Sequence, residues 1–257
     1  MHRSKHALLK VVKAIGMMIA LFGLYGSSGL ARADNSLQSE IVVHDDLSYS
    51  KEDPELKMDL FLPGKTHRSV PCVMVIQGGG FRAQDGQRFR PFAVHLAKHG
   101  FAAALIAYRG RPRHTYQVTL SDTKAAVRYV RKISQKYSID PDRIGALGGS
   151  AGATLAVFLA VTGEMEKFEG GGGHSAYSSR IQAAVAYAGV YDFVARYHAE
   201  RQIRTKPHVD RKKKTFKQWI GPAFHINKQP WLDVSAINHV DKEDPPVLFM
   251  HGKQDYL

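Results

Sequence analysis

A serine flanked by glycines stands where a short apolar segment gives way to a longer one. The stretch from Gly148 to Gly152, with Ser150 at its centre, follows the apolar residues 144–147 and opens the apolar residues 151–162. A tight strand-to-helix turn lifts a serine oxygen clear of the backbone, and only small neighbours avoid clashes there. The helix N-terminus also favours negative charge that develops on a bound carbonyl oxygen. We therefore predict that Ser150 is a nucleophile.

A run of three glycines lies about seventy residues upstream of this serine. Gly78, Gly79 and Gly80 follow Gln77 and the apolar residues 73–76. Backbone without Cβ atoms can turn its N–H groups toward a substrate oxygen, as an oxyanion hole requires. We expect the amides of Gly79, Gly80 and Ala151 to be the donors. A plain turn or a phosphate-binding loop is the alternative, but the Lys-Ser/Thr or G-x-G-x-x-G continuation typical of a phosphate-binding loop is absent.

A third pattern lies at the end of the sequence. The apolar residues 247–250 are followed by His251, Gly252 and, three residues later, Asp255. In the chain order serine, acid, histidine, Asp255 occupies the place of the acid that orients a histidine. The alternative is an ordinary turn aspartate.

Short apolar runs alternate with helical stretches along most of the chain, which indicates a mainly parallel sheet covered by helices on both faces. Two helices are expected, an amphipathic surface helix over residues 121–136 and a deeply packed helix over residues 151–162. In the surface helix, Lys124 and Arg128 are expected to face away from the apolar side. The expected strands cover residues 41–43, 58–62, 73–76, 102–107, 144–147, 183–188 and 247–250.

The strand signal disappears over residues 191–235, where we expect an insertion that caps the C-terminal edge of the sheet. Residues 201–217 within it contain eight basic side chains and one acid, Asp210. A solvated face is the simple interpretation and a docking site for acidic polysaccharide the alternative. The glycines at 170–173 are interpreted as a flexible loop.

These motifs together resemble the carboxylesterase and acetylesterase branch of the α/β-hydrolase superfamily, and in particular its feruloyl-esterase-like and hormone-sensitive-lipase-like members. The resemblance covers residues 41–257 and implies an eight-stranded, mostly parallel sheet that hydrolyses carboxylic esters through an acyl-serine intermediate, without cofactor or metal. The substrate would be a small ester or an acylated polysaccharide. The sequence segments that carry the resemblance are Val75 to Phe81, Tyr108-Arg109, Ser138 to Ile144, Gly148 to Gly152 and Pro245 to Asp255.

Two departures from the family pattern concern the site. Gln77 stands where the family usually has a histidine, and its amide can still hydrogen-bond and hold the loop. The resemblance also places the catalytic histidine about thirty residues beyond the acid, after one more strand. This sequence ends two residues beyond Asp255, so we expect the last strand, a covering helix and the base to be missing and activity to be impaired. A fragment of a longer protein, a gene whose end was assigned wrongly and a decayed gene copy would each explain the missing histidine.

No other histidine is a convincing substitute. His251 is expected to pack near the site, and His95 and His99 lack the glutamate of a zinc-peptidase motif because Leu96 stands between them. A base must lie within hydrogen-bond reach of the nucleophile and be oriented by a third group. The same requirement argues against the histidines in or near the insertion, which are His174, His198, His208, His225 and His239.

Residues 1–33 have the plan of a secretory signal peptide, with a basic start, an apolar centre and a small-residue end at Ala31-Arg32-Ala33. We therefore expect residues 34–257 to form one exported hydrolase domain, secreted or periplasmic. An uncleaved anchor is the alternative and the only expected contact with a membrane. Cleavage would lower the net charge from +13 to +8 by removing five basic residues.

The remaining composition narrows the functional classes. An exported protein rarely meets nucleic acid, so we expect no nucleic-acid partner, and the positive charge favours anionic surfaces or only solubility. The one cysteine, Cys72, lies in an apolar run and is expected to be a buried thiol. Two other functions stay open: a non-catalytic remnant that binds polysaccharide or a partner through the basic cap, and a prolyl-peptidase-like hydrolase. The oligomeric state is open as well.

Overall fold

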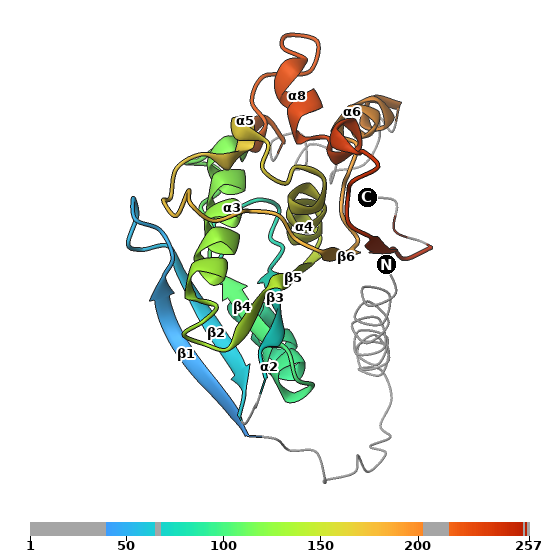
Figure 1. The fold of residues 1–257 in the computed structure, drawn as a ribbon. Helices are drawn as coiled ribbons and strands as arrows, with labels where there is room; N and C mark the ends of the chain where they lie inside the picture. Colours follow the sequence, from blue (N-terminus) through green and yellow to red (C-terminus); the bar gives the residue numbers. More distant parts are fainter. Residues whose placement is uncertain (1–39, 65–67, 203–215, 254, 256–257) are drawn as a thin grey trace.

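The computed structural model describes residues 40–64, 68–202, 216–253 and 255, which form one seven-stranded sheet with helices against both faces (Figure 1). The strand order is β1-β2-β4-β3-β5-β6-β7. β1 and β2 pair antiparallel at one edge, β2 pairs antiparallel with β4, and all other pairs are parallel. The strands are β1 (Ile41–Ser48), β2 (Lys57–Pro63), β3 (Val70–Ile76), β4 (Ala102–Ile106), β5 (Ile139–Gly149), β6 (Ala183–Tyr187) and β7 (Val247–Met250).

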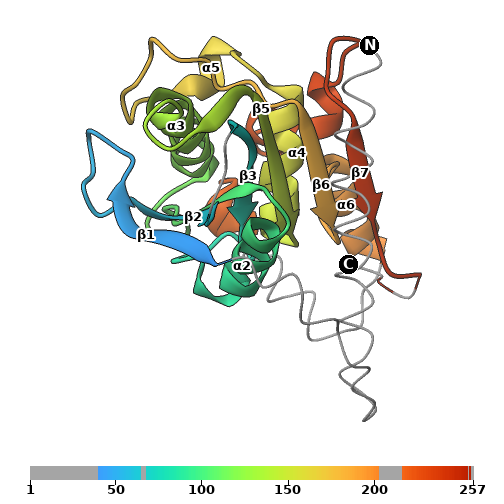
Figure 2. The ribbon, with the colours of Figure 1, turned by 60° about the horizontal axis from the view of Figure 1, so that its bottom comes forward.

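The helices divide between the two faces of the sheet (Figure 2). α3 and α4 contribute to the larger of two core clusters and α2 to the smaller one. Along β3 the side chains alternate between them, since Met74 packs into the larger cluster and Val73 and Val75 into the smaller one. The helices are η2 (Gln87–Phe89), α2 (Arg90–Lys98), α3 (Tyr116–Ile133), α4 (Ala151–Val161), α5 (Glu166–Glu169), α6 (Phe193–Gln202), α8 (Gln229–Val234) and η3 (Ala236–His239).

All seven predicted strands are confirmed, and so is the mostly parallel sheet with helices on both faces. The differences lie at element ends, where turn chemistry competes with periodicity. β5 begins at Ile139 rather than at residue 144, and α3 begins at Tyr116 rather than at residue 121. α4 matches its prediction to within one residue and is buried along its whole length.

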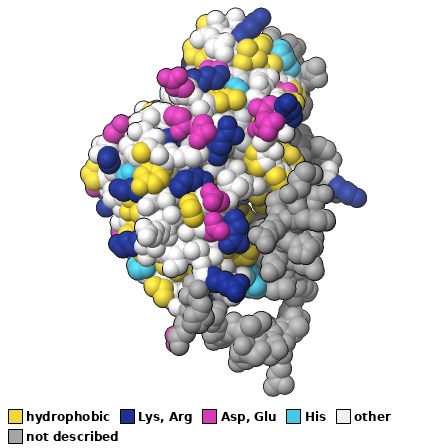
Figure 3. Space-filling view, in the orientation of Figure 1, with side chains coloured by type: hydrophobic (Ala, Val, Ile, Leu, Met, Phe, Trp, Pro, Cys, Tyr) yellow, Lys and Arg dark blue, Asp and Glu magenta, His cyan; other side chains and the backbone are white. Residues whose placement is uncertain are grey.

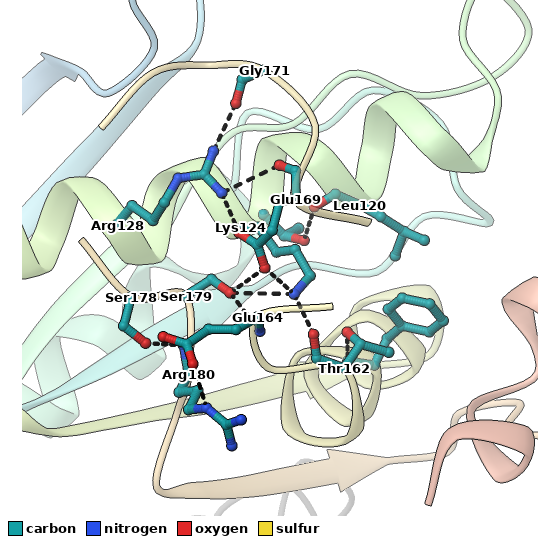
Figure 4. Close-up of polar contacts among 12 residues, drawn as sticks. Leu120, Lys124, Arg128, Thr162, Glu164, Glu169, Gly171, Ser178, Ser179 and Arg180 are labelled. Carbon is teal, nitrogen blue, oxygen red and sulfur yellow. Dashed lines mark hydrogen bonds and ion pairs between the residues drawn. The ribbon is translucent and has the colours of Figure 1, made fainter. Parts of the chain in front are cut away.

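The prediction that α3 presents its cations to solvent was wrong for two of them. The side chain of Lys124 is 0 % exposed and that of Arg128 4 %. Lys124 donates through Nζ to the carbonyl of Thr162 and to the carboxylate of Glu169, 2.8 Å away, and Arg128 pairs with the other oxygen of the same carboxylate (Figure 4). Buried cations are tolerated when a carboxylate and backbone oxygens satisfy them. Helical periodicity cannot show that such a partner exists.

The same cluster also corrects the interpretation of residues 170–173 as a flexible loop. The carbonyls of Gly171 and Gly173 accept hydrogen bonds from Arg128, and the carbonyl of Gly172 accepts one from the amide of Lys51. Gly170 has a φ of +55°, which an L side chain rarely adopts. These glycines therefore form a pinned turn that wraps the Arg128 guanidinium.

No strand is described between β6 and residue 235, and the insertion over residues 191–235 stays a prediction. α6, the helical residues 216–219 and α8 lie together at one end of the molecule (Figure 1). Most of the basic stretch 201–217 and all of residues 1–39 lie outside the described residues, so the cap's charge and the signal segment stay predictions. No helix within the described ranges is both long and apolar enough to cross a membrane.

Cys72 lies within β3 and is buried, as predicted. Burial raises the pKa of its thiol to about 12. The thiol is therefore protonated at neutral pH and packs as a small apolar side chain.

Candidate active site

Ser150 occupies a sharp turn between β5 and α4. Its φ of +53° and ψ of −121° fall outside the regions that non-glycine residues favour. The amide of Ser150 donates to the carbonyl of Tyr187 on β6, and its carbonyl accepts from the amides of Ala153 and Thr154. These bonds fix the backbone of Ser150 on both sides while its side chain stays exposed. Strain of this kind is typical of residues whose side chains must be displayed for chemistry.

Glycines at two positions let the backbone close around this turn. An ideal Cβ at Gly152 would lie 2.0 Å from the carbonyl oxygen of Ile76, at the end of β3. One at Gly78 would lie 2.2 Å from the carbonyl oxygen of Gly149 and 3.0 Å from the Cβ of Ser150. Real Cβ atoms essentially never approach backbone atoms so closely. The glycine loop and the serine turn, far apart in the sequence, are therefore in direct backbone contact.

Each carbonyl of this glycine loop, residues 77–81, has a donor. The hydroxyl of Tyr108 donates to Gln77, the guanidinium of Arg88 to Gly78, and Nε of Arg111 to Gly80. Backbone amides donate to the other two, Gly79 and Phe81. Burial raises the pKa of Tyr108, so its hydroxyl keeps the proton that it donates. The loop is thus held through its oxygen atoms.

The backbone N–H groups next to Ser150 differ from these carbonyls in their hydrogen bonding. Within the described part of the chain, the N–H groups of Gly79, Gly80 and Ala151 donate to no protein acceptor. Preorganised donors left open beside an exposed hydroxyl are what an oxyanion hole requires. Gln77, where the family resemblance expects histidine, is buried and donates through Nε2 to the side chain of Gln84.

Residues of the predicted insertion pack directly on the glycine loop. Phe81 stacks on Trp219 with ring centroids 3.7 Å apart and an interplanar angle of 13°. Trp219 is buried and donates through Nε1 to the hydroxyl of Thr119 on α3. The guanidinium of Arg111 bridges the two parts, because it contacts Gly80 through Nε and Gln218 through Nη1. Sequence patterns assign no such role to Arg88, Tyr108 or Arg111, because each role depends on contacts distant in the sequence.

Asp255 lies beyond the end of β7, at the same edge of the sheet as Ser150. Its carboxylate is 3.3 Å from Nε2 of His251, and its amide donates to the carbonyl of Gly252. Gly149 pairs with Tyr187 and Tyr187 with Met250. His251 therefore begins two strand spacings from the serine turn, or about 10 Å. The structure brings Asp255 and His251 together at this edge of the sheet.

Histidine pairs elsewhere form no metal site in the described ranges. His95 and His99 stack at 4.1 Å on α2, and Nδ1 of His99 contacts the carbonyl of His95. No group of three His, Cys, Asp or Glu side chains there is arranged to bind a metal ion.

Comparison with known proteins identifies a family model and relatives that match the chain. The BD-FAE family model matches residues 58–257. The probable carboxylic ester hydrolase LipM of Mycobacterium tuberculosis is 32 % identical over 77 % of this chain and 43 % of its own length, and the esterase LipQ of the same organism is 28 % identical over 73 % and 42 %. The chain thus spans less than half the length of these curated relatives.

Solved structures agree in fold. A truncated carbohydrate esterase from gut microbiota superposes with a TM-score of 0.73 at 24 % identity, covering 88 % of this chain and 81 % of that one. A bifunctional GH43-CE protein of Bacteroides eggerthii gives a TM-score of 0.70 at 26 % identity over 80 % of this chain and 30 % of that one. The family-model match over residues 58–257 shows that the chain belongs to the BD-FAE family, and the solved structures agree with its α/β-hydrolase fold.

Proposed function

We propose that this chain carries the nucleophilic half of a serine-dependent carboxylic ester hydrolase that acts on acyl or acetyl esters, including those of carbohydrates. The observation that carries the proposal is the position of Ser150. Its strained turn packs on Gly78, beside open amides at Gly79, Gly80 and Ala151. The names of LipM and LipQ support the reaction class, and the carbohydrate esterase neighbours support the substrate class.

The reaction runs in two halves. Oγ of Ser150 attacks the ester carbonyl carbon and gives its proton to an imidazole base, while the carbonyl oxygen gains the electron pair and accepts hydrogen bonds from the three amides. The C–O bond to the alcohol then breaks, and the alcohol leaves with the proton from the imidazolium. Water repeats the sequence on the acyl-serine, releasing the carboxylic acid and restoring the Ser150 hydroxyl.

Asp255 is proposed to orient the imidazole base in this scheme. It follows β7, the edge strand of the described sheet, at the carboxyl ends of the parallel strands, and its carboxylate contacts the imidazole of His251. The family resemblance assigns the base to a histidine beyond Asp255. We therefore propose that the chain as given turns over slowly and that a form extended through the downstream reading frame supplies the base. Residues 1–33 are proposed to direct export.

The test is turnover of p-nitrophenyl acetate by the given chain, by the extended form and by Ser150→Ala in the extended form. The proposal expects turnover by the extended form and a loss of roughly a thousandfold or more in kcat for Ser150→Ala. A matched Ser134→Ala variant, altered just after α3, controls for general effects of removing a serine hydroxyl. An inactive extended form, or full activity in Ser150→Ala, would reject the proposal and favour a non-catalytic binding protein.

A further inference from the structure

Three arginines lie on or directly beside the glycine loop. Nη2 of Arg88 lies 2.8 Å from the carbonyl oxygen of Gly78, and Nε of Arg111 lies 2.7 Å from that of Gly80. Arg82 follows the loop directly, and its side chain is exposed. Nη2 of Arg111 is also 3.5 Å from where a Cβ on Gly80 would be. Two of the cations thus flank the same residues that pack on Ser150 and offer the open amides.

These arginines differ from their neighbours in having no carboxylate partner. Arg90 pairs with Asp45 and Asp59, and Arg109 with Asp53 and Asp122. In contrast, none of the three arginines around the loop forms an ion pair within the described part of the chain; the side-chain acceptors of Arg88 and Arg111 are the neutral amides of Gln84 and Gln218.

The one acidic residue close by in the sequence does not neutralise the cluster. Asp85 accepts a hydrogen bond from the amide of Gln87, and no ion pair joins it to the three arginines. Elsewhere on the surface, basic and acidic side chains are interspersed, as Figure 3 shows for one face. An uncompensated group of positive charges next to a candidate reaction centre is therefore a local feature of the site.

The charges also act on one another. Burial and the neighbouring charge of Arg82 lower the pKa of Arg111 below its ordinary value. Like charges in proximity raise the free energy of the unliganded site, and an anion placed among them relieves this repulsion. Guanidinium groups bind carboxylates through paired N–H donors, which makes a carboxylate a suitable anion.

We propose that the ester taken by this site carries a carboxylate, as an acylated uronic-acid saccharide does, and that Arg82, Arg88 and Arg111 bind this carboxylate. The ester carbonyl would then lie against the amides of Gly79 and Gly80. The inference rests on the proposed function for the place of the reacting ester, but carboxylate binding itself requires no turnover.

The test uses calorimetric titration of the Ser150→Ala chain, so that hydrolysis does not enter the readout. The two probes are hexagalacturonate and neutral xylohexaose at low ionic strength. The proposal expects the acidic oligosaccharide to bind at least about tenfold more tightly, with the preference falling as salt is added. It expects Arg82→Gln to weaken hexagalacturonate binding roughly fivefold, the equivalent of about 1 kcal/mol for one exposed charge pair.

Two further variants keep the outcome interpretable. The guanidinium of Arg82 donates no hydrogen bond among the described residues, and the Gln84 side chain contacts Arg82 only at its backbone carbonyl, so replacing the side chain should leave the loop intact. Arg143→Gln is the charge-matched control, since Arg143 lies in the first half of β5, toward the edge opposite Ser150. Arg111→Lys keeps the charge while removing the paired donors, and should retain part of the affinity.

Equal affinity for the two oligosaccharides, no binding of either, or equal losses in Arg82→Gln and Arg143→Gln would overturn the inference. So would binding abolished only when Arg211, Lys212, Lys213 and Lys214 are changed to Gln, which would assign the polyanion to the cap. Tighter binding of hexagalacturonate than of xylohexaose, together with no ester turnover by the extended form, would reject the proposed function but not this inference. Turnover of neutral acetyl esters by the extended form, together with equal binding of the two oligosaccharides, would reject this inference but not the proposed function.

Discussion

The backbone of Gly78 packs against Ser150 so closely that a Cβ there would lie 3.0 Å from the Cβ of the serine and 2.2 Å from the carbonyl oxygen of Gly149. This contact joins the loop after β3 to the turn after β5, which are adjacent parallel strands. Backbone packing therefore sets the distance between the serine hydroxyl and the open amides of the loop, while Tyr108, Arg88 and Arg111 hold the loop through its carbonyl oxygens.

Gly78→Ala should disable the extended enzyme with little effect on the rest of the fold. The added methyl group must push the loop away from the serine turn, and a displacement of about 1 Å at a reaction centre costs on the order of a hundredfold in rate. Steady-state kinetics with p-nitrophenyl acetate would show this as a fall in kcat. Unchanged kcat would mean that the loop takes no part in the reaction.

Gly100→Ala provides the matched control for that substitution. Gly100 has a φ of +84° and open space where a Cβ would lie, and it precedes β4 at the edge of the sheet opposite Ser150. The positive φ should cost about 1 kcal/mol of unfolding free energy. We expect a lower urea midpoint with unchanged kcat.

Trp219→Phe should loosen the contact between the insertion and the glycine loop. The smaller ring can still stack on Phe81, but it cannot donate to the hydroxyl of Thr119. We expect a loss of about 1–2 kcal/mol in unfolding free energy and a change in KM larger than that in kcat. Denaturant unfolding and steady-state kinetics measure the two effects, and a kcat loss without any change in KM would contradict this role of the insertion.

Glu169→Gln should destabilise the fold strongly, because it leaves the buried cations Lys124 and Arg128 without their shared carboxylate. Breaking a buried pair of this kind costs about 3–5 kcal/mol. Glu164→Gln is the control, since Glu164 pairs with Arg180 at the surface and exposed pairs contribute about 1 kcal/mol or less. Equal effects of the two substitutions in urea unfolding would show that burial does not set the strength of the network.

The stability of the same network should fall at acidic pH. Burial alone would raise the pKa of Glu169, but hydrogen bonds from Lys124 and Ser179 and the two nearby cations hold it below its ordinary value. A carboxylate whose pKa is lowered by folding stabilises the folded state above its unfolded pKa, and this contribution is lost as the pH falls through the folded pKa. The difference in unfolding free energy between wild type and Glu169→Gln should therefore shrink below about pH 4.5. A difference that stays constant down to pH 3 would contradict this.

The sheet could be predicted from sequence because parallel strands buried on both faces are short, continuous apolar runs, as at Val73 to Ile76 and Val247 to Met250. The serine turn was visible for a similar local reason, since glycine is required at close backbone approaches. Both signals lie within a few adjacent residues.

The positions of Lys124 and Arg111 could not be predicted in this way. Lys124 is buried because Glu169 and Ser179, distant in the sequence, supply its acceptors. Arg111 reaches Gly80 and Gln218, and neither contact leaves a periodic pattern. Polar side chains whose environment is built by long-range partners have no signature in the local sequence.

Whether Ser150 is the nucleophile is decided by the rate of p-nitrophenyl acetate hydrolysis by the extended form before and after Ser150→Ala. Turnover should fall at least about a thousandfold when the hydroxyl is removed, with the folded state retained as judged by circular dichroism. Undiminished hydrolysis by Ser150→Ala would show that another group attacks the ester.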